Sequence, residues 1–140
     1  MEKFICELVY NPKSKELAIP VTLSGNGRKI VDCIGIIDTG ATSTMISEQV
    51  AEELRLYPCG EISVSGVHGT NKSDLYFLDI VFGDFVLANH RVSGSTGDAG
   101  FDILIGMDIL SMGEFEFVRF GGRKIFLFGI PALSGSERLF

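Results

Sequence analysis

Residues 34–43 read Ile34-Gly-Ile-Ile-Asp38-Thr-Gly-Ala-Thr-Ser43, and the rest of the chain is organised around this stretch. Its isoleucines predict a strand that is buried on both faces. A carboxylate directly at the end of a buried strand must be hydrogen-bonded, paired or used in chemistry. Asp38 is therefore a candidate catalytic residue, and the alternative is an Asx-type turn in which its side chain only caps its own loop.

The residues that follow Asp38 are small. Thr39 offers a hydroxyl group, Gly40 permits a close approach of another backbone group or a positive φ, and Ala41 leaves room beside the carboxylate. We therefore expect that a ligand can lie against this turn.

The composition indicates one domain of the all-β class. A chain of 140 residues with 46% hydrophobic residues is large enough to bury one core and too short for two. Its 17 glycines and 11 phenylalanines, with many Val and Ile, favour short strands joined by tight turns. We expect the domain to span residues 1–131, followed by a weakly patterned tail over 132–140.

Charge and cysteine content narrow the classes of partner. A formal charge of −6 and a pI near 4.8 argue against a nucleic acid or an anionic membrane surface as partner. Three cysteines without a C-x-x-C spacing give little support to a disulfide framework or a zinc site. Neither a signal-peptide core nor a membrane span is present in the sequence as given, so we expect a cytoplasmic protein.

Runs of alternating polar and apolar residues, together with continuous apolar runs, predict where the other helices and strands lie. A helix is predicted to begin after Ser47 as N-cap and to end before Pro58, and a short helical turn follows Gly106. Residues 4–10 and 16–23 read as a hairpin, and the aromatic hairpin at the end of the chain is expected to face a partner chain in part. The predicted strands are 4–10, 16–23, 29–37, 61–65, 75–82, 85–92, 101–105, 115–118 and 125–128.

A glycine-rich segment, 66–71, interrupts the strands at 61–65 and 75–82 and reads as the tip of a hairpin. Alone it is an ordinary surface turn, but beside the Asp38 motif it is typical of a lid. His68 at this tip is a possible ligand or base. With His90 as the only other histidine, it does not make a metal site.

Three features stand in order along the chain: Asp38-Thr39-Gly40-Ala41, the glycine-rich hairpin, and Ile103-Leu-Ile-Gly106 before a short helix. Together they resemble the retropepsin-like aspartic proteases over roughly residues 21–128. The amino-acid sequence of residues 41–54 and 106–110 is most similar to the cellular and bacterial gag-like branch. The resemblance implies an all-β fold, a closed barrel with a flap hairpin and one or two short helices.

Two positions depart from the retroviral pattern. Retroviral enzymes usually carry an acidic residue directly after the Asp-Thr-Gly-Ala stretch and an arginine after the helix glycine, and the two pair to brace the site. This chain has Thr42 and Met107 at these places, so that brace is absent. The cellular branch lacks the same pair.

The resemblance implies an aspartic endopeptidase that works as a homodimer. Asp-Thr-Gly occurs once, whereas the chemistry uses two carboxylates facing one water, so a two-fold axis would bring two copies of Asp38 together. By the same resemblance, Thr39 would hydrogen-bond across the axis and the Gly40 amide would support Asp38. No metal or other cofactor is required.

The resemblance also implies a substrate, an extended peptide held beneath the flap as an added strand. Alternatives remain open for the wall residues, since each of them would serve equally as core, Ile105 above all. The substrate-binding candidates are Ala41, Ile62, Val64, Gly66, Val67, His68 and Gly69, with Ile105 as a further wall residue.

Two other functions are compatible with the sequence. One is a catalytically weak module of the same fold that binds peptides or mediates dimerisation, which would not need the intact acid. The other is a metal-dependent hydrolase using Asp32 and Asp38, which lacks the usual clustering of His and carboxylate ligands.

Overall fold

The computed structural model describes residues 2–10, 17–25, 29–66, 69–95 and 100–130. Several predicted features lie outside the described residues: the turn at 11–14, most of the turn at 25–27, Val67 and His68 at the hairpin tip, and the tail over 132–140.

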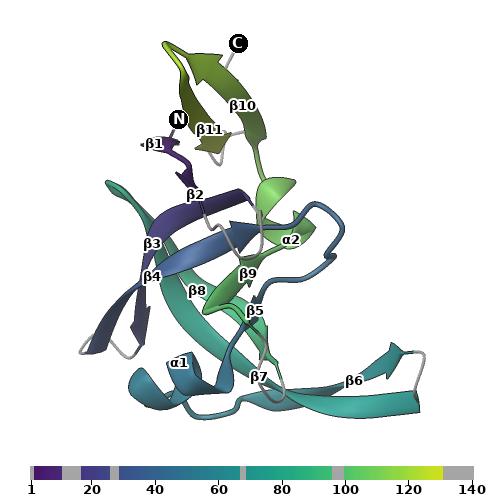
Figure 1. The fold of residues 1–140 in the computed structure, drawn as a ribbon. Helices are drawn as coiled ribbons and strands as arrows, with labels where there is room; N and C mark the ends of the chain where they lie inside the picture. Colours follow the sequence, from purple (N-terminus) through teal and green to yellow (C-terminus); the bar gives the residue numbers. More distant parts are fainter. Residues whose placement is uncertain (1, 11–16, 26–28, 67–68, 96–99, 131–140) are drawn as a thin grey trace.

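Six strands close into a barrel (Figure 1). Going round the ring, each strand is hydrogen-bonded to the next, and the β3–β7 pairing closes it. The predicted all-β closed barrel with short helices is therefore confirmed. In ring order the strands are β3 (Leu17–Gly25), β4 (Lys29–Ile37), β9 (Ile103–Ile105), β5 (Met45–Ile46), β8 (Phe85–Gly94) and β7 (Gly69–Phe82).

A long hairpin projects from the barrel at the lower right of Figure 1. It consists of β6 (Gly60–Gly66) and the first half of β7, which pair antiparallel from Gly60↔Leu75 to Gly66↔Gly69. The described residues of the predicted glycine-rich segment, Gly66 and 69–71, therefore lie at the outer end of this hairpin.

Two short helices accompany the barrel. The first, α1 (Glu48–Glu53), begins as predicted at Ser47, whose Oγ accepts a hydrogen bond from the Val50 N–H at 3.1 Å. The second, α2 (Met107–Leu110), begins directly after Gly106. No helix in the described ranges is long and apolar enough to cross a membrane.

A separate three-stranded sheet stands at the top of Figure 1, in the order β1 (Glu2–Glu7), β11 (Arg123–Ile130) and β10 (Glu114–Phe120). The predicted hairpin of residues 4–10 with 16–23 is therefore wrong for most of its length. Of the first predicted strand, only the end, β2 (Val9–Tyr10), pairs with β3. Burial of Phe4 explains the difference, because its ring packs edge-on against Phe82 and Phe126 at centroid distances of 5.6 and 6.4 Å.

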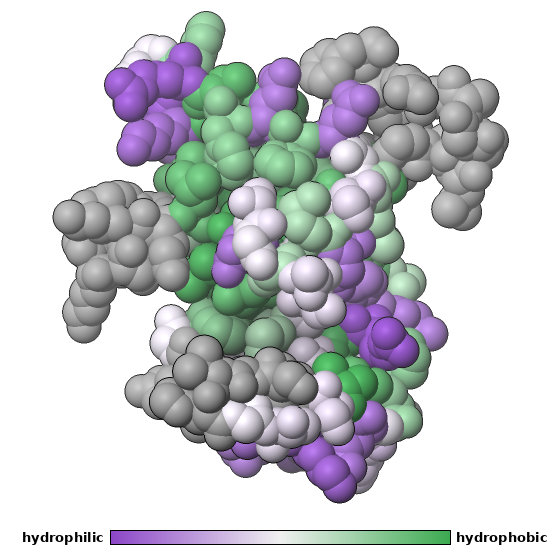
Figure 2. Space-filling model, turned by 90° about the vertical axis from the view of Figure 1, so that its right-hand side faces the viewer, coloured by the Kyte–Doolittle hydropathy of each residue, from purple (hydrophilic) through white to green (hydrophobic). Residues whose placement is uncertain are grey.

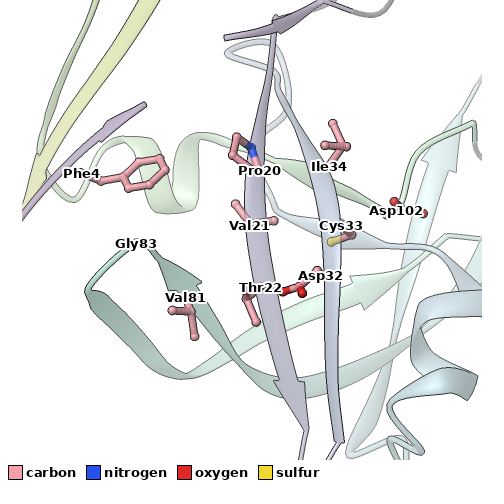
Figure 3. Close-up of a pocket in the computed structure, with 10 residues that line it drawn as sticks. All are labelled: Phe4, Pro20, Val21, Thr22, Asp32, Cys33, Ile34, Val81, Gly83 and Asp102. Carbon is pink, nitrogen blue, oxygen red and sulfur yellow. Dashed lines mark hydrogen bonds between the residues drawn. The ribbon is translucent and has the colours of Figure 1, made fainter. Parts of the chain in front are cut away.

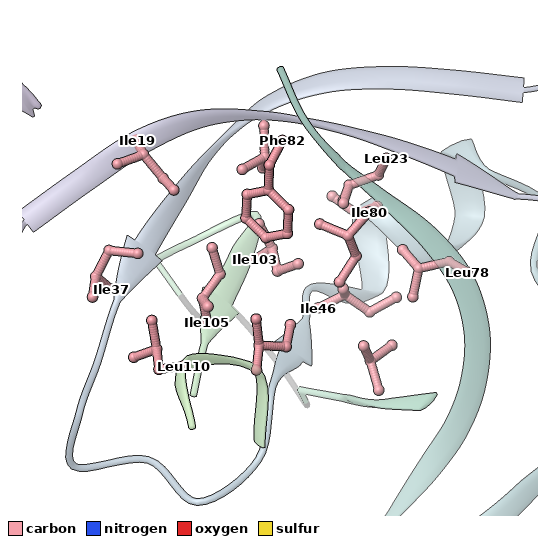
Figure 4. Packing of buried hydrophobic residues seen from close by; sticks show 14 of the residues in the cluster. Ile19, Leu23, Ile37, Ile46, Leu78, Ile80, Phe82, Ile103, Ile105 and Leu110 are labelled. Carbon is pink, nitrogen blue, oxygen red and sulfur yellow. The ribbon is translucent and has the colours of Figure 1, made fainter. Parts of the chain in front are cut away.

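The core fills the barrel with aliphatic side chains from all its strands (Figure 4). The prediction that β4 is buried on both faces holds only at its carboxyl end, where Ile36 and Ile37 are buried. Ile34 is 39% exposed because the preceding part of β4 turns one face outward. The buried end is the part that leads into Asp38.

Candidate active site

Asp38 follows directly after β4, at the point where this strand runs parallel to β9. Its backbone N–H donates to the Ile105 carbonyl at 3.0 Å, which continues the pairing one residue past the strand. The side chain is half-buried, at the end of the barrel strand. The sheet therefore fixes the backbone of Asp38 and leaves its carboxylate partly accessible.

The carboxylate is oriented by its own turn. Asp38 Oδ1 accepts a hydrogen bond from the Gly40 N–H at 2.8 Å, and the Ala41 N–H donates to the Asp38 carbonyl at 3.2 Å. This is the Asx-type turn that the sequence left open as an alternative. It is compatible with catalysis, because within the described ranges no hydrogen bond occupies Oδ2. Thr39 and Gly40 are exposed beside it.

The loop after Asp38 lies against the start of α2, so the two motifs singled out in the sequence meet. The Met107 N–H donates to the Ala41 carbonyl at 2.8 Å, and the Gly106 N–H donates to Thr44 Oγ1 at 3.1 Å. A Cβ atom on Gly106 would lie only 2.8 Å from the carbonyl carbon and oxygen of Ser43. Only glycine permits this close approach.

A polar network, which sequence reasoning missed, continues from the loop into the barrel. Thr44 is fully buried, and its Oγ1 donates to Asp108 Oδ1 at 2.7 Å. Asp108 Oδ2 is hydrogen-bonded to His90 Nε2 at 3.0 Å. No sequence motif links a loop, a helix and β8, and the available signal was weak: an acid in the first turn of α2 and one histidine in a strand.

Burial and hydrogen bonding act in opposite directions on Asp108. Burial raises its pKa, but hydrogen bonds from His90 and Thr44 together outweigh burial, so the pKa of Asp108 lies below its ordinary value of 3.8. The carboxylate is therefore held in its charged form.

A groove of about 450 Å³ opens beside this network. Its lining includes Ser43, Thr44, His90 and Asp108, and also Ile62 and Leu75 from the projecting hairpin. The structure therefore brings Ile62 close to the loop that follows Asp38.

The other predicted wall residues are placed differently. Val64 and Gly66 lie on β6, and Gly69 begins β7 with a φ of +114°, a conformation that favours glycine. Ile105 is only 1% exposed and belongs to the core, which was the alternative for this residue.

Asp32 lies far from Asp38. It faces another cavity, of about 560 Å³, where Thr22 Oγ1 donates to Asp32 Oδ1 at 2.7 Å (Figure 3). The two aspartates are six positions apart along extended chain, which corresponds to about 20 Å. A metal site that uses both is therefore excluded by their positions. Cys33 lines the same cavity, and burial, with smaller contributions from nearby carboxylates, raises the pKa of its thiol to about 12.

Exposed apolar side chains gather on the three-stranded sheet. On β10, Phe120 is 75% exposed, Phe117 38% and Val118 36%. Figure 2 shows apolar residues over the upper part of one face, at the height of this sheet. Among the described residues β10 pairs with β11 alone, so its second edge is open.

Comparisons with known proteins agree with this fold. The family model described as aspartyl protease matches residues 19–109. A retropepsin-like aspartic protease from Rickettsia conorii has a similar structure, with a TM-score of 0.60 at 20% identity over 90% of this chain and 92% of that one. The EIAV protease in complex with the inhibitor HBY-793 gives a TM-score of 0.53 at 18% identity over 74% and 92%. A comparison with curated proteins finds no match.

The family model spans well over half of the chain, from β3 to α2, and includes Asp38-Thr39-Gly40 as well as Gly106. The structural matches support the same barrel. The chain therefore belongs to the aspartyl protease family and has the retropepsin-like fold.

Proposed function

We propose that the protein is an aspartic endopeptidase whose active site is shared between two copies of the chain. The observation that carries this proposal is the state of Asp38: one carboxylate oxygen is fixed by the Gly40 N–H, and the other has no hydrogen-bond partner among the described residues. A carboxylate held in this way is suited to bind and activate a water molecule.

A homodimer follows from the single motif. Peptide hydrolysis by this route needs two facing carboxylates, and the chain has one Asp-Thr-Gly. A two-fold axis beside the exposed Thr39 would supply the second Asp38 from a partner subunit. The open edge and exposed aromatic residues of β10 are consistent with an interface between chains.

Chemistry in the dimer would divide between the two carboxylates. Like charges in close contact cannot both ionise, so the pair shares one proton. The ionised carboxylate takes a proton from water as the oxygen of that water attacks the peptide carbonyl, and the protonated carboxyl donates its proton to the carbonyl oxygen. Collapse of the resulting tetrahedral species breaks the C–N bond, and the amine leaves with a proton from the pair.

The proposed substrate is an extended peptide segment of a protein. The β6–β7 hairpin would act as the flap, with Val67 and His68 at its tip between Gly66 and Gly69, and the peptide would pair with its backbone. Ala41, Ile62 and Val64 would contact substrate side chains. The groove between Ile62 and the loop after Asp38 supports this arrangement.

We also infer a reducing compartment, the cytoplasm, because Cys6, Cys33 and Cys59 are all free thiols. Residues 1–131 would form the single protease domain, with 132–140 as its tail.

The test of the proposal is cleavage of an unstructured protein or a peptide library at mildly acidic pH. We expect Asp38→Asn to lower the rate at least about 1,000-fold, because the dyad loses its proton acceptor. Asp32→Asn is the matched control, with the same substitution within the strand that leads to Asp38, and should cleave like the wild type. Unchanged cleavage by Asp38→Asn would refute the proposal, and loss in both variants would point to unfolding, which circular dichroism detects.

A further inference from the structure

The side chains at the two positions that brace retroviral sites do not hold the loop after Asp38 in this protein. Thr42 is exposed and Met107 is half-buried with an apolar side chain, so neither offers an ion pair. The loop is nevertheless fixed to α2 through the Ala41 carbonyl and the Thr44 hydroxyl.

Thr44 is the central link. Its hydroxyl accepts from the Gly106 N–H at 3.1 Å and donates to Asp108 Oδ1 at 2.7 Å, so one buried oxygen connects the loop to both the backbone and a side chain of the α2 region. A buried hydroxyl with its donor and acceptor capacity both used is rigid, since either bond lost would leave a buried polar group without a partner.

His90 anchors the other end of the network. Its Nε2 lies 3.0 Å from Asp108 Oδ2, and the two side chains are only 13% and 26% exposed. His90 belongs to β8, which pairs with β7, the strand that continues into the projecting hairpin. The network therefore ties the loop after Asp38 to the strands that carry the proposed flap.

We propose that the chain Thr44–Asp108–His90 is the brace of the catalytic loop in this protein, and that His90 is a positioning residue. It acts on catalysis through Asp108 and Thr44, which keep the loop of residues 38–44 in place against α2. The expected effect of this brace on activity rests on the proposed function. Its effect on the position of the loop does not depend on activity.

The test of this brace compares pairs of variants that differ in one hydrogen bond. Thr44→Val removes the hydroxyl at nearly constant volume, and Thr44→Ser retains it. Thr22→Val is the matched control, because Thr22 also donates to an aspartate at 2.7 Å but lies on the outer face of β3. His90→Leu removes the bond to Asp108, whereas the amide of His90→Gln is able to restore it.

Two readouts separate positioning from general stability. We expect Thr44→Val and His90→Leu to lower kcat about tenfold or more with less than a twofold change in KM, at a temperature where all variants are folded. Hydrogen–deuterium exchange in residues 38–46 should rise at least several-fold in both variants, with exchange in β3 unchanged. Thr44→Ser, His90→Gln and Thr22→Val should stay within about threefold of the wild type in both readouts.

The hydrogen–deuterium exchange measurement tests the brace even if the wild type does not cleave peptides. Failure of the brace is therefore distinguishable from failure of the proposed function. Wild-type exchange at 38–46 in both Thr44→Val and His90→Leu would overturn the brace. A uniform rise of exchange over the whole barrel, without rescue by His90→Gln, would reduce the network to an ordinary structural contact and would also overturn it.

Discussion

The carboxylate of Asp108 joins three parts of the chain, because it accepts from Thr44 in the loop after Asp38, contacts His90 in β8 and belongs to α2 itself. Its pKa is below 3.8 in the folded protein. A lowered pKa means that the charged form stabilises the fold, and that this contribution is complete above the unfolded value and is lost as the pH falls through the folded value.

We therefore expect Asp108→Asn to lower the free energy of unfolding by about 1.5–3 kcal/mol between pH 5 and 7, as for a hydrogen bond to a charged group. Below the ordinary pKa of 3.8 the difference from the wild type should shrink as the wild-type carboxylate takes up a proton. Urea unfolding at several pH values measures this.

Glu7→Gln is the control for charge removal. Glu7 and Arg123 also form an ion pair, at 2.8 Å, but both side chains are more than half exposed. Exposed pairs contribute little to stability, so this variant should change unfolding far less than Asp108→Asn. An equal loss in the two variants, or a loss at Asp108 that does not depend on pH, would contradict the role given to this carboxylate.

Among the elements, the contact between α2 and the loop after Asp38 depends on the absence of a side chain at Gly106. A Cβ atom there would lie 2.8 Å from Ser43 backbone atoms and 2.9 Å from the Ala41 carbonyl oxygen. Backbone atoms cannot turn away as a side chain can, so the loop itself would have to move.

Gly106→Ala should lower the free energy of unfolding by about 1–3 kcal/mol, the usual cost of overpacking, and should lower kcat because it displaces the loop that holds Asp38. Gly60→Ala is the matched control for stability, since its Cβ would lie 3.6 Å from the nearest atom, a Leu75 methyl carbon. Thermal unfolding and cleavage assays test both variants. A Gly106→Ala protein that is as stable and active as the wild type would contradict the close contact between Gly106 and the loop.

The sequence predicted most elements near the site because their signals are local. The Ser47 cap, the strand before Asp38 and the hairpin around Gly66 depend on neighbouring residues, and all three were found in place. The partner of β1 was predicted wrongly, because strand pairing between residues 2–7 and 125–130 is set by aromatic packing over more than a hundred residues of chain. The contact of His90 with Asp108 escaped prediction because it joins a strand to a helix, and no local sequence signal marks such a pair.

At the scale of the whole molecule, one chain offers half of the proposed site. The barrel, its fixed Asp38 and the projecting hairpin are present in a single copy, and in the proposed site the second carboxylate would come from another chain. Activity should therefore depend on pairing of chains, and a subunit that lacks the acid should inactivate the dimers that it enters.

The most direct test of the shared site is the activity of mixtures of wild-type and Asp38→Asn chains, refolded together at constant total concentration. If each active site needs two wild-type chains, an equal mixture should retain about a quarter of the wild-type rate, as random pairing of two subunits requires. A rate of about one half, falling linearly with the wild-type fraction, would show that a single chain is active alone and would contradict the proposed dimeric site.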